Sequence, residues 1–83
     1  MMRNEQLEIV ILKNLARIDT GLREKTLQCA VEIEMDRADL TSAEFEDALV
    51  SLRDRALIDN WQNLIGNKIW CITATGRDAL KGL

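Results

Sequence analysis

The side chains that could carry out chemistry in this sequence are carboxylates and two thiols. The 83 residues include 14 Asp and Glu, two Cys and no His. Without His the chain lacks the most common general base and a usual zinc ligand. Cys29 and Cys71 lie outside any C-x-x-C pair, and the four glycines form no phosphate-cradling loop. We therefore expect no metal, no cofactor and no catalytic residues, and a protein that is not an enzyme.

Charge and composition favour a small acidic domain that spans residues 1–83. The net charge of -3 opposes the simplest form of phosphate binding, because modules that bind nucleic acids usually carry an excess of basic residues. Hydrophobic residues make up 47% of the chain and Pro is absent, as in ordered, helix-rich domains. The longest apolar run, Ile9–Leu12, is too short to span a bilayer. We expect a cytoplasmic protein that does not contact membranes and keeps its cysteines reduced.

Apolar spacing predicts two helices in the first part of the chain. The first is expected to begin after Asn4, which suits an N-cap, and to run to about Arg17. The second is expected over about residues 23–34. Its end stays open, because residues 31–35 also alternate between apolar and polar types as a strand does.

The third helix has the clearest sequence signal. Thr41 and Glu44 have the spacing of a capping box, and an apolar stripe follows that begins at Phe45. Thr73 is a similar N-cap for a short C-terminal helix that ends near Gly82. The order of elements is therefore three helices, a hairpin and a short helix.

A β-hairpin is expected after residue 57, where the apolar period changes. Gly66 and Asn67 suit a two-residue type II′ turn. That turn places Trp61 opposite Ile72, with Trp70 beside them on the face that covers the helices. The other face then carries a second set of apolar residues, namely Ile58, Leu64, Ile69 and Cys71.

Two stretches of the chain resemble bacterial winged-helix regulators. Residues 40–58 run from the capped third helix to a small residue, Ala56, which precedes Leu57 and Ile58. Residues 70–77 end in a Thr-x-x-Gly-Arg step at Thr73, similar to that of the multiple-antibiotic-resistance and phenolic-acid regulator groups. The resemblance implies an α+β, mostly helical, winged-helix fold, with a three-helix bundle, a β-hairpin wing and a short terminal helix.

The resemblance also implies residues that would contact nucleic acid. In winged helices that bind DNA, the third helix enters the major groove and the wing contacts phosphate or the minor groove. The corresponding contact residues here are Arg23, Lys25, Arg37, Ser42, Glu46, Arg53 and Lys68. Asp47 and Asp54 oppose this interpretation, because they lie on the outward face of the third helix. The basic residues could equally be solvated surface charges paired with neighbouring carboxylates.

Apolar residues outside the expected core suggest a protein interface instead, or in addition. They lie on a second face of the first helix and on the wing, and comprise Ile9, Leu12, Ala16, Leu64, Ile65 and Ile69. A homodimer or another protein would cover them, unless a different hairpin register buries them. Asn14 could fix the register of such a dimer, or bond a nearby backbone group. Two functions stay open, namely a dimeric prokaryotic or phage DNA-binding module and a winged helix that binds proteins.

Overall fold

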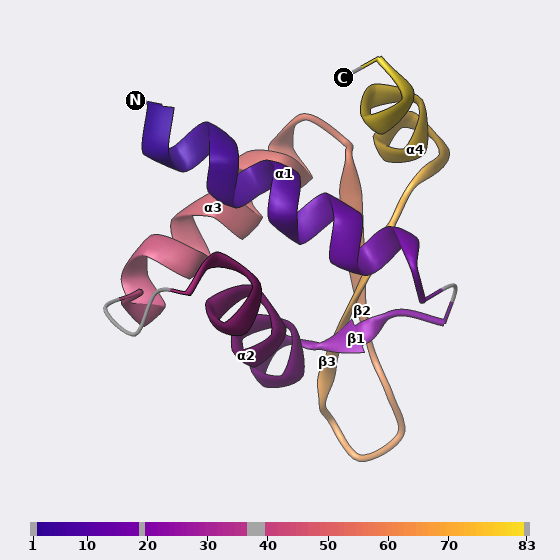
Figure 1. Ribbon diagram of the computed structural model, residues 1–83. Coiled ribbons are helices and arrows are strands. Elements are labelled where there is room, and N and C mark those ends of the chain that lie inside the picture. Colours follow the sequence, from indigo (N-terminus) through magenta and orange to yellow (C-terminus); the bar gives the residue numbers. More distant parts are fainter. Residues whose placement is uncertain (1, 19, 37–39, 83) are drawn as a thin grey trace.

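Three helices pack beside a three-stranded sheet, and a fourth helix lies at the C-terminal end (Figure 1). The computed structural model describes residues 2–18, 20–36 and 40–82. Its elements are α1 (Met2–Ala16), β1 (Leu22–Arg23), α2 (Glu24–Met35), α3 (Ser42–Asp54), β2 (Ile58–Gln62), β3 (Lys68–Ile72) and α4 (Ala74–Lys81). This is a winged helix, α+β and mostly helical, as the sequence predicts. In the described residues no helix is long and apolar enough to cross a bilayer.

Strand β1 is not predicted by the sequence. The sheet order is β1-β3-β2, and Leu22 pairs with Trp70 while Arg23 pairs with Ile69. Gly21 permits this pairing, since a Cβ there would lie 2.7 Å from the Trp70 carbonyl oxygen. Two residues are too few to show strand alternation. Helix α2 therefore begins at Glu24, one residue later than predicted, and it continues through Met35, so the strand alternative for residues 31–35 is wrong.

The hairpin register differs from the prediction because its loop is longer. The Asn63 side-chain oxygen accepts bonds from the backbone nitrogens of Ile65 (3.1 Å) and Asn67 (3.0 Å). The backbone nitrogen of Asn63 also donates to the Asn67 carbonyl oxygen (3.0 Å). These bonds close a loop of residues 63–67, in which Gly66 does have a positive φ of 85°. The two-residue turn is therefore wrong.

Because the loop is longer, the face of β2 that points to the core is the opposite of the predicted one. Trp61 pairs with Ile69 and Ile58 pairs with Ile72. Successive strand residues face opposite sides, so an odd shift exchanges the two faces of a strand. Ile58 is consequently 2% exposed in the core, where it joins Trp70, whereas Trp61 is 50% exposed on the outer face. The predicted positions of Ile58 and Trp61 are both wrong, and that of Trp70 is confirmed.

Helix α1 lies inside the molecule more fully than its sequence suggests. It begins at Met2, two residues before the expected cap. Leu12, predicted to be an exposed interface residue, is 4% exposed and belongs to the core. Helix α4 packs against α1, and the Arg77 guanidinium donates to the Ala16 carbonyl oxygen (3.2 Å). Ile9 and Ala16 are half-buried as a result.

Two predicted caps are present, and one of them anchors α4. The Thr41 hydroxyl accepts from the Glu44 backbone nitrogen (3.1 Å), and the Thr73 hydroxyl accepts from that of Gly76 (3.0 Å). The Thr73 hydroxyl also donates to the Ala56 carbonyl oxygen (2.7 Å). A Cβ at Gly76 would overlap the Leu57 carbonyl group. The Thr-x-x-Gly step therefore holds α4 against the exit from α3.

The exit from α3 requires a left-handed residue, and this chain has alanine there. Ala56 has φ 61°, and its backbone nitrogen donates to the Arg53 carbonyl oxygen (2.9 Å). A Cβ disfavours this conformation by about 1–2 kcal/mol, so that glycine would be favoured at this position.

We predict that Ala56→Gly raises the free energy of unfolding by about 0.5–1 kcal/mol, because relief of the left-handed strain exceeds the entropy that glycine adds to the unfolded chain. Urea unfolding followed by circular dichroism measures the change. The control Ala30→Gly, within α2, should lower stability by about 0.5–1 kcal/mol. Equal destabilisation by both variants would contradict the strain at Ala56.

Candidate nucleic-acid interface

Three basic side chains gather where β1, α2 and the wing meet. Arg23, Lys25 and Lys68, together called the basic cluster below, line a hollow of about 430 Å³ with Asn67 and Glu24. The β1–β3 pairing causes this proximity, since Arg23 lies opposite Ile69, the neighbour of Lys68. All three basic side chains are exposed. The structure thus brings together three of the predicted contact residues that are far apart in sequence.

A second hollow, of about 220 Å³, lies between α3 and β3. Its lining includes Glu46 and Arg53 from α3, together with Lys68 and Trp70 from β3. The Lys68 amino group lies 5.7 Å from the centre of the Trp70 ring, within the range of a cation–π interaction. Lys68 therefore belongs to both hollows and connects the wing to the outward side of α3.

Glu24 is the carboxylate that balances the basic cluster, and it is anchored. Its Oε1 accepts a hydrogen bond from the Trp70 indole nitrogen (3.0 Å). Glu24 also lines both hollows described above. Trp70 is buried, so this bond satisfies a polar group that would otherwise be costly to bury. It also fixes the start of α2 relative to β3.

Of the remaining predicted contact residues, Ser42 lies near the basic cluster and Arg37 does not belong to the described part of the chain. Ser42 lines a third hollow, of about 480 Å³, with Lys25 and Gln28. Arg55, also close to the end of α3, forms an ion pair with Glu8 of α1, so that its charge is directed away from the basic cluster.

The outward face of α3 is acidic, as the sequence indicates. Glu46, Asp47 and Asp54 are all exposed, and Val50 lies exposed among them. Arg53 is the one basic residue within α3, and Arg55 is the C-cap residue that follows the helix. Positive charge therefore flanks α3 at its side and at the wing, whereas its centre is negative.

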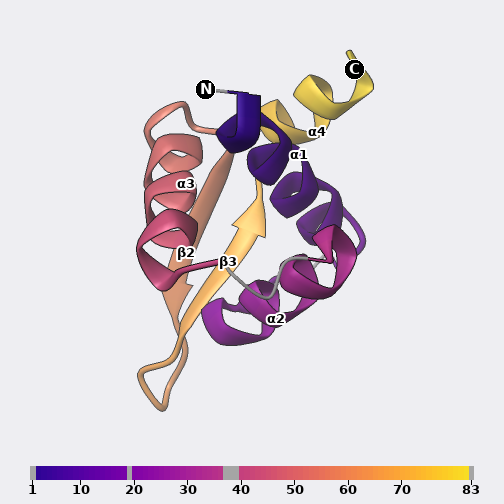
Figure 2. The same cartoon turned by 60° about the vertical axis from the view of Figure 1, so that its left-hand side comes forward.

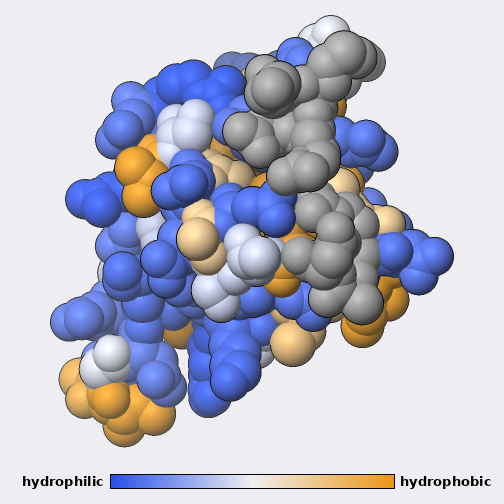
Figure 3. All heavy atoms as spheres, turned by 90° about the vertical axis from the view of Figure 1, so that its left-hand side faces the viewer, coloured by the Kyte–Doolittle hydropathy of each residue, from blue (hydrophilic) through white to orange (hydrophobic). Residues whose placement is uncertain are grey.

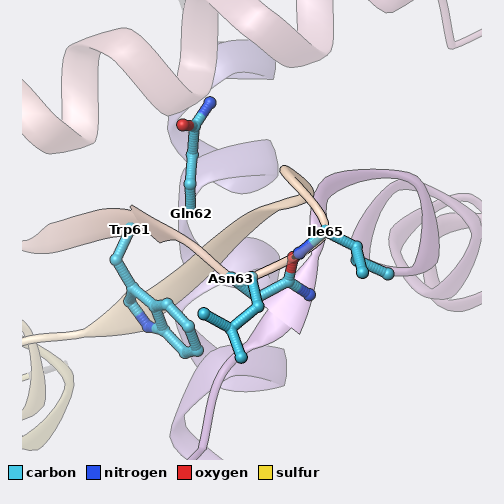
Figure 4. Close-up of a pocket in the computed structure, with 5 residues that line it drawn as sticks. Trp61, Gln62, Asn63 and Ile65 are labelled. Carbon is cyan, nitrogen blue, oxygen red and sulfur yellow. Dashed lines mark hydrogen bonds between the residues drawn. The ribbon is translucent and has the colours of Figure 1, made fainter.

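The wing ends in exposed apolar side chains. Leu64 is fully exposed and Ile65 is 76% exposed; these two residues are called the wing tip below. The loop that carries them projects beyond the helices (Figure 2), and an apolar cluster is visible at this projecting end (Figure 3). With Trp61, the wing tip lines a hollow of about 480 Å³. Trp61 and Gln62 point to opposite sides of β2 (Figure 4).

Other predicted interface residues are buried or form hydrogen bonds within the chain. Ile69 is buried, because Gly21 and β1 cover it, so its assignment to an exposed apolar face is wrong. Asn14 donates to the Val10 carbonyl oxygen (2.9 Å) and to Glu34 Oε1 (3.1 Å), bonds made within one chain.

Cys71 is a free thiol, and burial raises its pKa, as does the charge of Asp59. It is thus a poor nucleophile at neutral pH.

Comparisons with solved structures identify the fold. A MarR-family transcriptional regulator from Silicibacter pomeroyi is 18% identical, with a TM-score of 0.76 over 92% of this chain and 47% of that one. SSV1 F-93 is 21% identical, with a TM-score of 0.72 over 92% of this chain and 79% of that one. The PcaV regulator from Streptomyces coelicolor, solved with its natural ligand, is 17% identical, with a TM-score of 0.74 over 89% and 48%.

The comparisons establish a winged helix like those of the MarR-type regulators. The chain spans about half the length of the MarR-family and PcaV structures. No protein-family model and no curated protein matches the sequence.

We predict that Glu24→Ala lowers the free energy of unfolding by about 1 kcal/mol more than Glu24→Gln. Both variants lose a charge near the start of α2, but only glutamine keeps an acceptor for the Trp70 indole. Urea unfolding of the two variants measures the difference. Equal stability would show that the Glu24–Trp70 bond does not hold α2 against β3.

Proposed function

We propose that this chain is a small prokaryotic or phage DNA-binding module of the transcription-regulator type, one domain over residues 1–83, without catalytic activity. It acts in the cytoplasm as a homodimer on duplex DNA. The observation that carries this proposal is the basic cluster beside α3, at the base of the wing. The fold shared with two transcriptional regulators supports it.

The proposed docking follows from the width of the grooves. The major groove is about 12 Å wide and admits one helix, which here is α3. With α3 in that groove, the basic cluster and Arg53 lie at its side, where phosphates line the groove. Ser42, at the start of α3, adds a hydroxyl that can donate to a phosphate. Arg37 belongs to the proposed contacts on sequence grounds alone.

A dimer reconciles the acidic composition with phosphate binding. Each protomer has a net charge of -3, and the centre of α3 repels DNA. Two protomers would present two basic clusters, and dimeric winged or helix-turn-helix proteins bind half-sites about one helical turn apart. The two clusters supply the affinity, and the carboxylates of α3 limit it.

We predict that the logarithm of the duplex-binding constant falls linearly with the logarithm of the salt concentration. Lys68→Gln should reduce the magnitude of this slope by about 1 for each protomer bound, because a protomer without this phosphate contact releases about one counterion fewer on binding. Fluorescence anisotropy with a mixed-sequence duplex measures both effects. The control Lys13→Gln removes an exposed charge from α1 and should leave the slope unchanged. Absence of binding at about 50 mM salt would refute the proposal.

A second candidate function is a winged helix that binds a protein through the same face. The acidic centre of α3 and the exposed wing tip favour it, since a basic partner with an apolar pocket would complement both. In this case Glu46, Asp47 and Asp54 would attract the partner. The two functions therefore make opposite predictions for these carboxylates.

Neutralising the outward carboxylates distinguishes the two functions. If α3 enters DNA, Asp47→Asn should tighten duplex binding about fivefold, because a charge that faces phosphates is removed. The matched control Asp78→Asn, exposed on α4, should change binding far less. Weaker or unchanged duplex binding by Asp47→Asn would contradict α3 as the inserted helix.

A further inference from the structure

We propose that the wing tip is an apolar wedge, which enters the minor groove, inserts between neighbouring base pairs and bends the duplex. This inference rests on the proposed DNA-binding function and extends it to a specific deformation of the DNA. It concerns Leu64 and Ile65, which the phosphate contacts do not use.

The geometry of the loop presents these two side chains to a partner. Leu64 and Ile65 belong to the loop between β2 and β3, and this loop is the projecting end of the hairpin (Figures 1 and 2). Asn63 holds the loop through its side-chain bonds to the backbone nitrogens of Ile65 and Asn67. These bonds hold the backbone of the loop, so that less backbone freedom is lost when the wing tip inserts.

The distribution of charge argues that the occupant is DNA. Although the chain has 14 acidic residues, none lies between Asp59 and Asp78, the stretch that contains the whole wing loop. Asn67 and Lys68 follow the wing tip after Gly66, and both line the hollow of the basic cluster. An uncharged apolar end with cations behind it matches a minor groove, whose base edges lie between two rows of phosphates.

A second copy of the chain fits this surface less well. Stable protein interfaces bury roughly 800 Å² on each partner. The exposed apolar side chains of the wing are Trp61, Leu64 and Ile65, at the end of a narrow two-stranded loop. Such a small projecting surface suits insertion into a groove better than flat packing against a copy of itself.

Leucine and isoleucine have the chemistry of a wedge. Proteins that kink DNA from the minor groove insert aliphatic side chains between base steps, and the cost of unstacking is offset by additional contacts to the bent duplex. Here those contacts would come from the basic cluster, since a kink toward the major groove opens the minor groove, lets the wing enter more deeply and brings the phosphates that border the groove closer to the cluster. TA and CA steps unstack most readily and should be preferred.

The test compares the full chain with Leu64→Ala/Ile65→Ala on a duplex of about 30 base pairs that has a central TA step and a fluorophore at each end. The wild type should raise energy transfer by an amount that corresponds to a bend of at least about 20°. The double variant should lose the bend and bind about tenfold more weakly, with an unchanged salt slope. Ile33→Ala, at a largely exposed apolar residue of α2, is the matched control and should behave as wild type.

The outcomes separate this inference from the function on which it rests. If the wild type binds with the expected salt dependence but the double variant binds and bends the duplex equally, the wedge is refuted and DNA binding stands. If the wild type binds no duplex at low salt, both are refuted. If the double variant instead loses self-association in sedimentation velocity and still bends DNA, the wing tip is a dimer contact and the wedge is wrong.

Discussion

Trp70 is the residue on which the arrangement of this domain depends. It lies in the central strand, pairs with Leu22 on one side and Asn60 on the other, and is 3% exposed. Its indole nitrogen bonds Glu24 at the start of α2, and its ring lies below Lys68. One buried side chain therefore connects the core to β1, to α2 and to the base of the wing. The basic cluster exists because these segments meet at Trp70.

Local signals in the sequence predict the starts of α3 and α4, but not the start of α1 or the pairing of the sheet. The Thr41 and Thr73 caps depend on residues three positions away, and both are present. The hairpin register depends on whether Gly66 and Asn67 alone form the turn or Asn63 closes a longer loop, and apolar patterning does not distinguish these cases. That one difference exchanged the faces of β2. Strand β1 was missed because its two residues gain their structure only by pairing with β3.

The sequence predicts which residues form the candidate site, but only partly how they are arranged in space. Arg23, Lys25 and Lys68 do meet, although they come from segments far apart in sequence. Arg55 is similar in type and position to Arg53, yet it pairs with Glu8, a partner that only the packing of α1 on α3 reveals. Leu12 is a core residue, and it lies beside Leu52 and Leu57 at the exit from α3 and beside Ala79 of α4. The net charge does not reveal that three basic side chains, those of Arg23, Lys25 and Lys68, gather on one surface.

The central claim is that an acidic winged helix binds DNA through one locally basic surface, and a nuclear magnetic resonance titration tests it most directly. The backbone amides of isotopically labelled protein would be followed while an unlabelled duplex is added at low salt. The account predicts that the amides that shift belong to residues 23–25, 42–54 and 64–68, whereas those of α1 and α4 stay unchanged. Shifts concentrated in α1 and α4, or no shifts at all, would contradict it.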